Sequence, residues 1–129
     1  MKLYESGEDY LEAILRLSRT GASVRSVDVA AELGFSKPSV SVAMKHLREG
    51  GLVVTEADGS LKLTPEGLAI AERVWERHSV LTSLFTRLGV SPEVAHADAC
   101  KIEHDLSEET FEKIKAFIAT IGENEQKAE

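Results

Sequence analysis

The sequence predicts a mainly α-helical protein whose N-terminal half is a winged helix-turn-helix unit. Three observations predict this class. Apolar residues recur at helical spacing in six separate stretches. A tight turn joins two short helices within residues 26–48, and a hairpin signal centred on Asp58-Gly59 follows them. The order helix, turn, helix, hairpin is typical of a winged helix-turn-helix.

The first two helices are defined by their apolar spacing and their ends. The first is expected from Tyr4 to about Arg19. Ser26 is the expected N-cap of a second, short helix over residues 27–33. Gly34 suits the left-handed conformation that ends many helices.

The third helix begins with a cap-then-proline signal. Ser36 is the expected N-cap, and Pro38 fits a first turn, where a missing N–H does no harm. The helix should run to about Arg48. The β-branched run 52–55 and the alternating run 61–63 are then expected to pair as the two strands of the wing.

The second half of the chain is expected to be helical throughout. A long helix is predicted over residues 65–88, with two apolar stripes that indicate burial on two sides. Shorter helices are predicted from Ser91-Pro92 to about His104 and from a Ser107 cap to Ile121. Residues 123–129 are polar and are expected to form a frayed tail.

Composition excludes several classes of protein. The 129 residues are 43% hydrophobic and 29% charged, which is typical of a globular protein and excludes a collagen or a disordered chain. The length allows one domain or two small domains that share a core. No apolar run is long enough for a transmembrane helix, so no membrane partner is expected. The single cysteine, Cys100, excludes an internal disulfide framework and favours a cytoplasmic location.

The net charge of −7 is unevenly distributed. Residues 1–64 hold eight Lys or Arg and nine Asp or Glu, whereas residues 65–129 hold seven and thirteen, so their charges are −1 and −6. Because acidic surfaces repel phosphate, any nucleic-acid surface is expected in the first half. The asymmetry indicates that the two halves of the chain have different functions.

The helix after Ser36 presents small polar donors and cations, as a helix that enters a DNA major groove must. Lysine on the wing can reach the phosphate backbone. An alternative is a solvated face of an ordinary helical scaffold. Residues 35–62 contain only four basic against three acidic residues, so tight binding should require a dimer on two half-sites. The predicted DNA-binding residues are Ser36, Lys37, Pro38, Ser39, Ser41, Lys45, Arg48 and Lys62.

Residue types that bind divalent transition metals gather on one face of the helix expected over residues 92–104: His96, Cys100, Glu103 and His104. Asp9 and Glu12 share a face of the first helix, and His78 lies on the long helix. Each has a simpler interpretation, as a surface imidazole, a buried thiol or an acid that complements a helix dipole. Spacing alone leaves both interpretations open.

Five stretches together resemble the iron- and manganese-dependent repressors of the diphtheria toxin repressor and manganese transport regulator type. They are E-D-Y-L-E-A-I at 8–14, F-S-K-P-S-V-S at 35–41, L-T-P-E-G at 63–67, E-R-H at 76–78 and A-C-K-I-E-H at 99–104. The resemblance covers about residues 4–120. It implies a winged-helix DNA-binding domain over 1–64 and a helical dimerisation and metal-binding domain over 65–122, in the short form without an SH3-like domain.

Carried over by position, the resemblance implies one metal site and a second beside it. The first would use Asp9, Cys100, Glu103 and His104. The second would use Glu12 and His78 and would share Glu103, with His96 as an ancillary ligand. The ligand set is a hybrid: Cys100 and His96 are similar to the iron type, the Asp9–Glu12 pair to the manganese type, and Thr82 stands where the iron type has Glu. Mn²⁺ or Fe²⁺ is therefore expected, with Zn²⁺ or Co²⁺ as substitutes in vitro.

The resemblance thus implies a metal-dependent DNA-binding regulator, a repressor of metal-ion homeostasis genes that binds a double-stranded operator as a homodimer. Neither enzymatic activity nor an organic cofactor is expected. Three alternatives stay open from the residues alone: a winged-helix regulator that senses an organic ligand or an oxidant through Cys100, a metal hydrolase, and a protein–protein winged-helix module. The hydrolase is disfavoured because the H-E-x-x-H spacing is absent.

Overall fold

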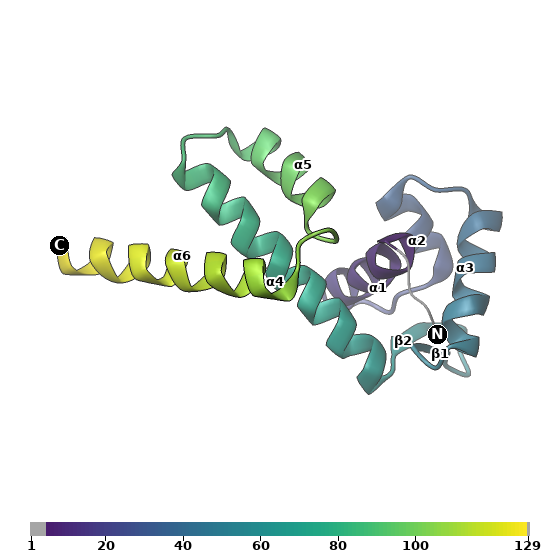
Figure 1. The fold of residues 1–129 in the computed structure, drawn as a ribbon. Coiled ribbons are helices and arrows are strands. Elements are labelled where there is room, and N and C mark those ends of the chain that lie inside the picture. Colours follow the sequence, from purple (N-terminus) through teal and green to yellow (C-terminus); the bar gives the residue numbers. More distant parts are fainter. Residues whose placement is uncertain (1–4, 129) are drawn as a thin grey trace. The chain divides into compact units, whose positions relative to one another are not determined.

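The computed structural model describes residues 5–128 (Figure 1). Tyr4, the expected start of the first helix, lies outside this range. The described part of the chain is mainly α-helical, as predicted, with these elements: α1 (Glu5–Ser18), α2 (Ser26–Leu33), α3 (Lys37–Glu49), β1 (Val53–Thr55), β2 (Leu61–Leu63), α4 (Pro65–Arg87), α5 (Pro92–Ile102) and α6 (Glu108–Ala128). The chain forms two compact units, Met1–Val74 and Trp75–Glu129, which divide within α4.

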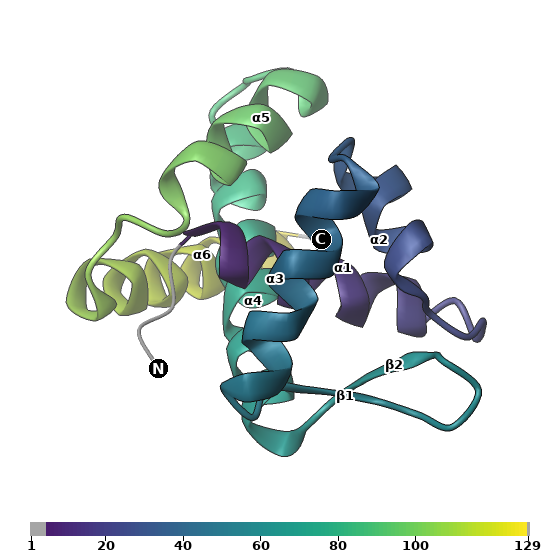
Figure 2. The same ribbon diagram turned by 90° about the vertical axis from the view of Figure 1, so that its right-hand side faces the viewer.

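The first unit packs α1, α2 and α3 with the hairpin (Figure 2). The stripe on α1 predicted from apolar spacing is buried, with Leu11 and Ile14 among its members. Val40, Met44 and Leu47 of α3 are buried at helical spacing, so the opposite face of α3 is left to solvent. The helix-turn-helix is therefore held by its own core.

Two of the three predicted caps in this unit are confirmed. Ser36 caps α3 by accepting a hydrogen bond from the Ser39 N–H at 3.3 Å. Gly34 ends α2 in the left-handed conformation, with φ 69°. The predicted Ser26 cap is wrong: Ser26 is already helical and Arg25 is the N-cap residue. The reason is Asp28, whose carboxylate accepts the Arg25 N–H at 2.8 Å and so starts the helix one residue earlier.

The wing is an antiparallel pair in the register Val53–Leu63, Val54–Lys62 and Thr55–Leu61. The strand predicted over 52–55 is one residue shorter, and that over 61–63 is confirmed. Val24 adds a bridge to Leu61, which ties the wing to the loop before α2. Gly59 has φ 87°, as a tight turn at this position requires.

The start of α4 is locked against the hairpin. Thr64 caps it by accepting the Gly67 N–H at 3.1 Å, and its hydroxyl donates to the Gly51 carbonyl. A Cβ on Gly67 would lie 2.0 Å from the Leu52 carbonyl oxygen, so only glycine fits there. Two ion pairs, Arg73–Glu8 at 2.8 Å and Arg19–Glu72 at 3.9 Å, link α1 and the residue that follows it to this part of α4.

The second unit contains the rest of α4 together with α5 and α6 (Figure 1). Its core includes Leu81, Ala95, Ala99 and Phe111. The Ser107 cap on α6 is confirmed, because its hydroxyl accepts the Thr110 N–H at 3.1 Å.

Two helix ends differ from the prediction. α5 ends at Ile102, two residues before His104, and Glu103 is its C-cap. α6 continues to Ala128, so the expected end at Ile121 is wrong and residues 123–128 are helical. One glycine costs a helix only about 1 kcal/mol, and the Glu, Gln, Lys and Ala residues after Gly122 favour helix. Within residues 5–128, the helices all fall short of the length and apolar character that crossing a bilayer demands.

Candidate metal centre and DNA-binding surface

Five predicted metal ligands lie together in the second unit. His78 is on α4, His96 and Cys100 are one turn apart on α5, and Glu103 and His104 follow directly after it. Ala95 and Ala99 of α5 are completely buried. The packing of this unit brings His78 within reach of three predicted ligands that are 18 to 25 positions away in the sequence.

Glu103 is the centre of the group. Its side chain is only 2% exposed, and its carboxylate lies between two imidazoles. Oε2 accepts a hydrogen bond from Nδ1 of His78 at 2.8 Å, and Oε1 lies 3.4 Å from Nε2 of His104. A buried carboxylate against two imidazoles supplies the oxygen and nitrogen donors of a first-row metal site.

His96 and Cys100 complete the exposed side of the group. Nε2 of His78 lies 2.9 Å from Nδ1 of His96. Sγ of Cys100 lies 3.8 Å from His78 Nδ1 and 3.9 Å from His96 Nε2. One donor atom from each of these three residues falls within 4.8 Å of the other two, which is compatible with a shared ion.

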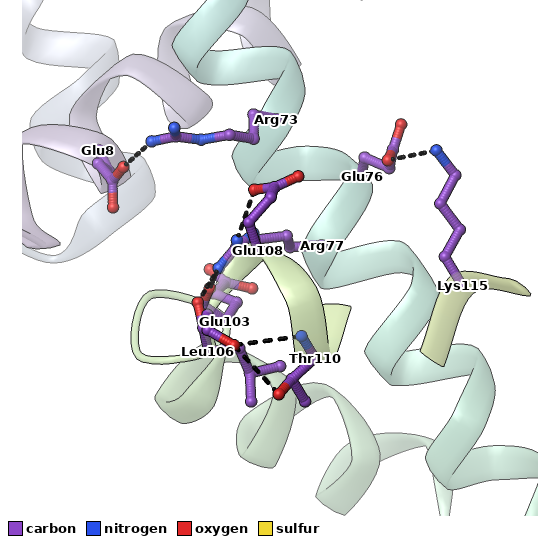
Figure 3. A network of polar contacts seen from close by, with 10 residues as sticks. Glu8, Arg73, Glu76, Arg77, Glu103, Leu106, Glu108, Thr110 and Lys115 are labelled. Atoms are coloured by element: carbon purple, nitrogen blue, oxygen red, sulfur yellow. Dashed lines mark hydrogen bonds and ion pairs between the residues drawn. The ribbon is translucent and has the colours of Figure 1, made fainter. Parts of the chain in front are cut away.

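A buried arginine that the sequence analysis missed holds this loop in place (Figure 3). Arg77 is 8% exposed, and its guanidinium donates to the carbonyls of Glu103 and Leu106 at 3.0 and 2.7 Å. It also pairs with Glu108 at 3.1 Å and lies over the Phe111 ring. The available signal was its position in the apolar stripe of α4, three residues after Val74 and four before Leu81. Arg77 therefore positions the backbone of a predicted ligand.

Thr82 lies one helical turn after His78 on α4. Its hydroxyl oxygen is buried and makes no hydrogen bond within the described residues. The short hydroxyl does not reproduce the carboxylate that the iron-type pattern has at this position, so the carboxylate of this group in the second unit is that of Glu103.

The other two predicted ligands belong to the first unit. Asp9 and Glu12 share a face of α1 at i, i+3 spacing, as predicted. Glu12 is 8% exposed, and Oε1 of its carboxylate lies 3.3 Å from Nε of Arg16. The remaining five predicted ligands are in the second unit, so the set is divided five to two between the units.

The predicted DNA-binding residues of the first unit form an exposed face. Those on α3 and at its N-cap are exposed, whereas Val40, Met44 and Leu47 of the same helix are buried. Arg48 reaches across to the wing, where its guanidinium lies 3.3 Å from the Thr55 hydroxyl. Lys62 is exposed on β2. All eight predicted DNA-binding residues are exposed: Ser36, Lys37, Pro38, Ser39, Ser41, Lys45, Arg48 and Lys62.

Hydrogen bonds within the wing turn stabilise the carboxylate of Asp58. The Asp58 carboxylate accepts the Ser60 hydroxyl at 2.6 Å and the Ser60 N–H at 2.9 Å. These bonds, the hydroxyl first, hold the pKa of Asp58 below its usual range. The Arg25 guanidinium donates to the Asp58 carbonyl, which anchors the turn to the loop before α2.

Both halves of the chain match family models. Residues 2–61 match the iron dependent repressor, N-terminal DNA binding domain, and residues 64–129 match the iron dependent repressor, metal binding and dimerisation domain. The chain belongs to the iron-dependent repressor family. Members of this family are transcriptional regulators and not enzymes, and this chain is a metal-dependent DNA-binding regulator.

Curated relatives agree with this assignment. The transcriptional regulator MntR of Escherichia coli O6:H1 is 40% identical over 115 residues, which cover 89% of this chain and 74% of that protein. The diphtheria toxin repressor of Corynebacterium diphtheriae is 32% identical over 121 residues, which cover 93% of this chain and 54% of the repressor.

Solved structures of metal-responsive regulators share the fold. The manganese regulator SloR superposes with a TM-score of 0.78 at 26% identity, over 92% of this chain and 55% of that one. A manganese-dependent transcriptional repressor in complex with manganese gives a TM-score of 0.81 at 27% identity, over 88% and 52%. The present chain thus spans about half the length of these two solved proteins.

Proposed function

We propose that this iron-dependent repressor is a homodimer that represses genes of metal-ion homeostasis when it is loaded with Mn²⁺ or Fe²⁺. One observation carries the proposal. Buried Glu103 lies against His78 and His104 inside the stretch that matches a metal binding and dimerisation domain. Buried charge is costly without partners, and a divalent cation offsets that cost.

The proposed ligands come from both units. Asp9, Cys100, Glu103 and His104 form the first set, and Glu12 and His78 form a second that shares Glu103. The proposed boundaries are 1–64 for DNA binding and 65–122 for dimerisation and metal binding. Since Asp9 and Glu12 precede the DNA-binding elements in the sequence and the other proposed ligands follow them, a bound cation would tie the two units together. The cation would supply positive charge and fixed coordination directions, and the chain supplies the ligand side chains from both ends of the sequence.

The donor types support Mn²⁺ and Fe²⁺ as candidates. Carboxylates such as Asp9, Glu12 and Glu103 suit Mn²⁺, whereas thiolate and imidazole shift the preference towards Fe²⁺ and softer ions. Zn²⁺ and Co²⁺ are expected to bind in vitro. Two structural relatives, the manganese regulator SloR and a manganese-dependent transcriptional repressor, respond to manganese by name, which supports Mn²⁺ as a candidate.

On the DNA side, we assign α3 to the major groove and the wing to the phosphate backbone. The exposed Ser and Lys residues at the start of α3 and the N–H groups of its first turn supply donors for phosphate and base edges. Two recognition helices of a dimer must lie about 34 Å apart, or a multiple of that, to read successive grooves. A metal that fixes their spacing needs only about 1.4 kcal/mol of coupling to raise operator affinity tenfold.

A binding titration tests this function. The protein is incubated with a random duplex pool in chelator, Mn²⁺, Fe²⁺ or Zn²⁺, and retained sequences are read out. We expect a palindromic sequence to be enriched with Mn²⁺ or Fe²⁺ and lost in chelator. Equal enrichment in chelator would overturn the metal switch, and peroxide sensitivity through Cys100 would then favour an oxidant sensor. No enrichment under any condition would favour the protein–protein module.

A further inference from the structure

We infer that Val42 of α3 recognises thymine in the operator, through a contact between its side chain and the C5-methyl group of one thymine in each half-site. This inference deepens the proposed function and rests on it, because it requires α3 to lie in the major groove. Val42 lies outside the predicted set of DNA-binding residues, which is dominated by hydroxyl donors and cations.

The first observation is the exposure of Val42. Among the described residues of the first unit, it is the most exposed large apolar side chain, at 56%. Apolar surface left in water is unfavourable, and a partner that covers it gains free energy. Because single exposed apolar residues are common on protein surfaces, the position of Val42 on α3 is the deciding observation.

Val42 lies on the outermost line of α3. An α-helix turns by about 100° per residue, so the buried side chains of Val40, Met44 and Leu47 lie about 140–200° around the helix from Val42. Val42 therefore points directly away from the core of the first unit. Since α3 begins at Lys37, Val42 also lies within its first two turns, the part of a recognition helix that contacts base edges.

The neighbours of Val42 on this face are polar. Ser39 and Lys45 lie three residues before and after it, Ser41 precedes it, and all three are exposed. These side chains supply hydrogen bonds and positive charge on either side of Val42. The side chain of Val42 itself can neither donate nor accept a hydrogen bond. The centre of the face is therefore apolar, and it favours a base edge that is apolar too.

Thymine is the base that provides such an edge. Its C5-methyl group is the apolar feature of the major groove, where the other three bases present hydrogen-bond donors and acceptors. Packing Val42 against those polar groups would remove water from them without a hydrogen bond in return, which costs free energy. Packing it against the thymine methyl group removes apolar surface of both partners from water. We therefore expect a T·A pair opposite Val42 in each half-site.

Replacement of thymine by deoxyuridine tests this contact, because uracil lacks only the C5-methyl group. Each thymine of the enriched operator is replaced in turn, and affinity is measured by fluorescence anisotropy under the conditions that enrich the operator. At one thymine we expect an affinity loss of about fourfold for one half-site and about 15-fold for both, the effect of removing one buried methyl group per protomer.

Val42→Ser identifies the residue that contacts the methyl group. Serine and valine have similar helix propensities, so α3 should stay folded. In this variant, the thymine and uracil operators should bind within about 1.5-fold of each other at that one position, while any effects at other thymines persist. The matched control is Val27→Ser, an exposed valine on α2, which should keep the full uracil effect.

The outcomes separate this contact from the proposed function. An operator that tolerates uracil at every thymine would overturn the contact and leave the proposed function standing. Uracil effects of equal size in Val42→Ser and in the unaltered protein at every thymine would refute the contact in the same way. Enrichment of no duplex under any condition would overturn the proposed function and the contact together.

Discussion

Nδ1 of His78 lies 2.8 Å from Oε2 of Glu103, across 25 residues of sequence and between two different structural elements. This hydrogen bond joins α4 to the end of α5 at the most deeply buried carboxylate of the candidate metal centre. This hydrogen bond fixes the orientation of the His78 imidazole and also the position of the Glu103 carboxylate. Changes at Glu103 should therefore affect metal binding before they affect the fold.

Glu103→Gln should lose Mn²⁺-dependent operator binding while the protein stays folded. The amide keeps the size of the side chain but removes the negative charge, so Mn²⁺ affinity should fall at least about tenfold. Fluorescence anisotropy of a labelled operator during Mn²⁺ titration measures this. Glu93→Gln, an exposed first-turn acid of α5, is the control. A normal Mn²⁺ midpoint in Glu103→Gln would refute the assignment of this ligand.

Lys37→Ala should weaken operator binding and leave metal affinity unchanged. Lys37 is exposed in the first turn of α3, where a cation contacts phosphate. The homodimer loses two phosphate contacts, one in each protomer, which reduces the slope of log affinity against log salt by about 2. Lys113→Ala, an exposed lysine on α6, should keep the original slope. Identical slopes for both variants would exclude a phosphate contact at Lys37.

Arg77→Met should lower the free energy of unfolding by about 2–4 kcal/mol, because two buried carbonyls lose a charged donor. Urea denaturation followed by circular dichroism measures the change. Arg87→Met, an exposed arginine near the end of α4, should stay within about 0.5 kcal/mol of the unaltered protein. Equal stability of the two variants would show that Arg77 is not a structural anchor.

Gly67→Ala should destabilise the first unit by about 1–3 kcal/mol or more, since the new Cβ would lie 2.0 Å from the Leu52 carbonyl oxygen. The expected readout is a lower Tm. Gly122→Ala is a matched control, because nothing lies within 4 Å of its added Cβ and alanine favours helix. Its Tm should be unchanged or higher. A Gly67→Ala protein as stable as Gly122→Ala would contradict the close approach.

Ser60→Ala should raise the pKa of Asp58 towards its ordinary value, because the hydroxyl that stabilises the carboxylate is removed. The folded-state pKa of Asp58 is lowered, so its contribution to stability is present above the unfolded pKa of about 4 and is lost as pH falls through the folded value. Carboxyl-carbon NMR titration measures the shift. An unaltered Asp58 midpoint in Ser60→Ala would refute the role of the hydroxyl.

Much of the fold follows from local signals in the sequence. Apolar spacing predicted the helices, and the Ser36, Gly34 and Ser107 ends were confirmed because caps act over only three or four residues. The errors have local causes too. Asp28 moved the start of α2 by one residue, and helix-favouring residues carried α6 past a glycine. Where two helix ends have similar free energies, small differences in capping and helix propensity decide between them. The spacing of apolar residues does not reveal these differences.

The sequence by itself determined which residue types were available as metal ligands and which face of α3 carries polar donors. Only the tertiary structure decided that His78 meets Glu103 and His96, and that Arg77 is buried beneath the loop that carries Glu103. Helical periodicity assigns a residue to a face of its own helix. Which faces then meet depends on the packing of whole helices against one another, and here that packing places His78 of α4 against His96 of α5 and against Glu103.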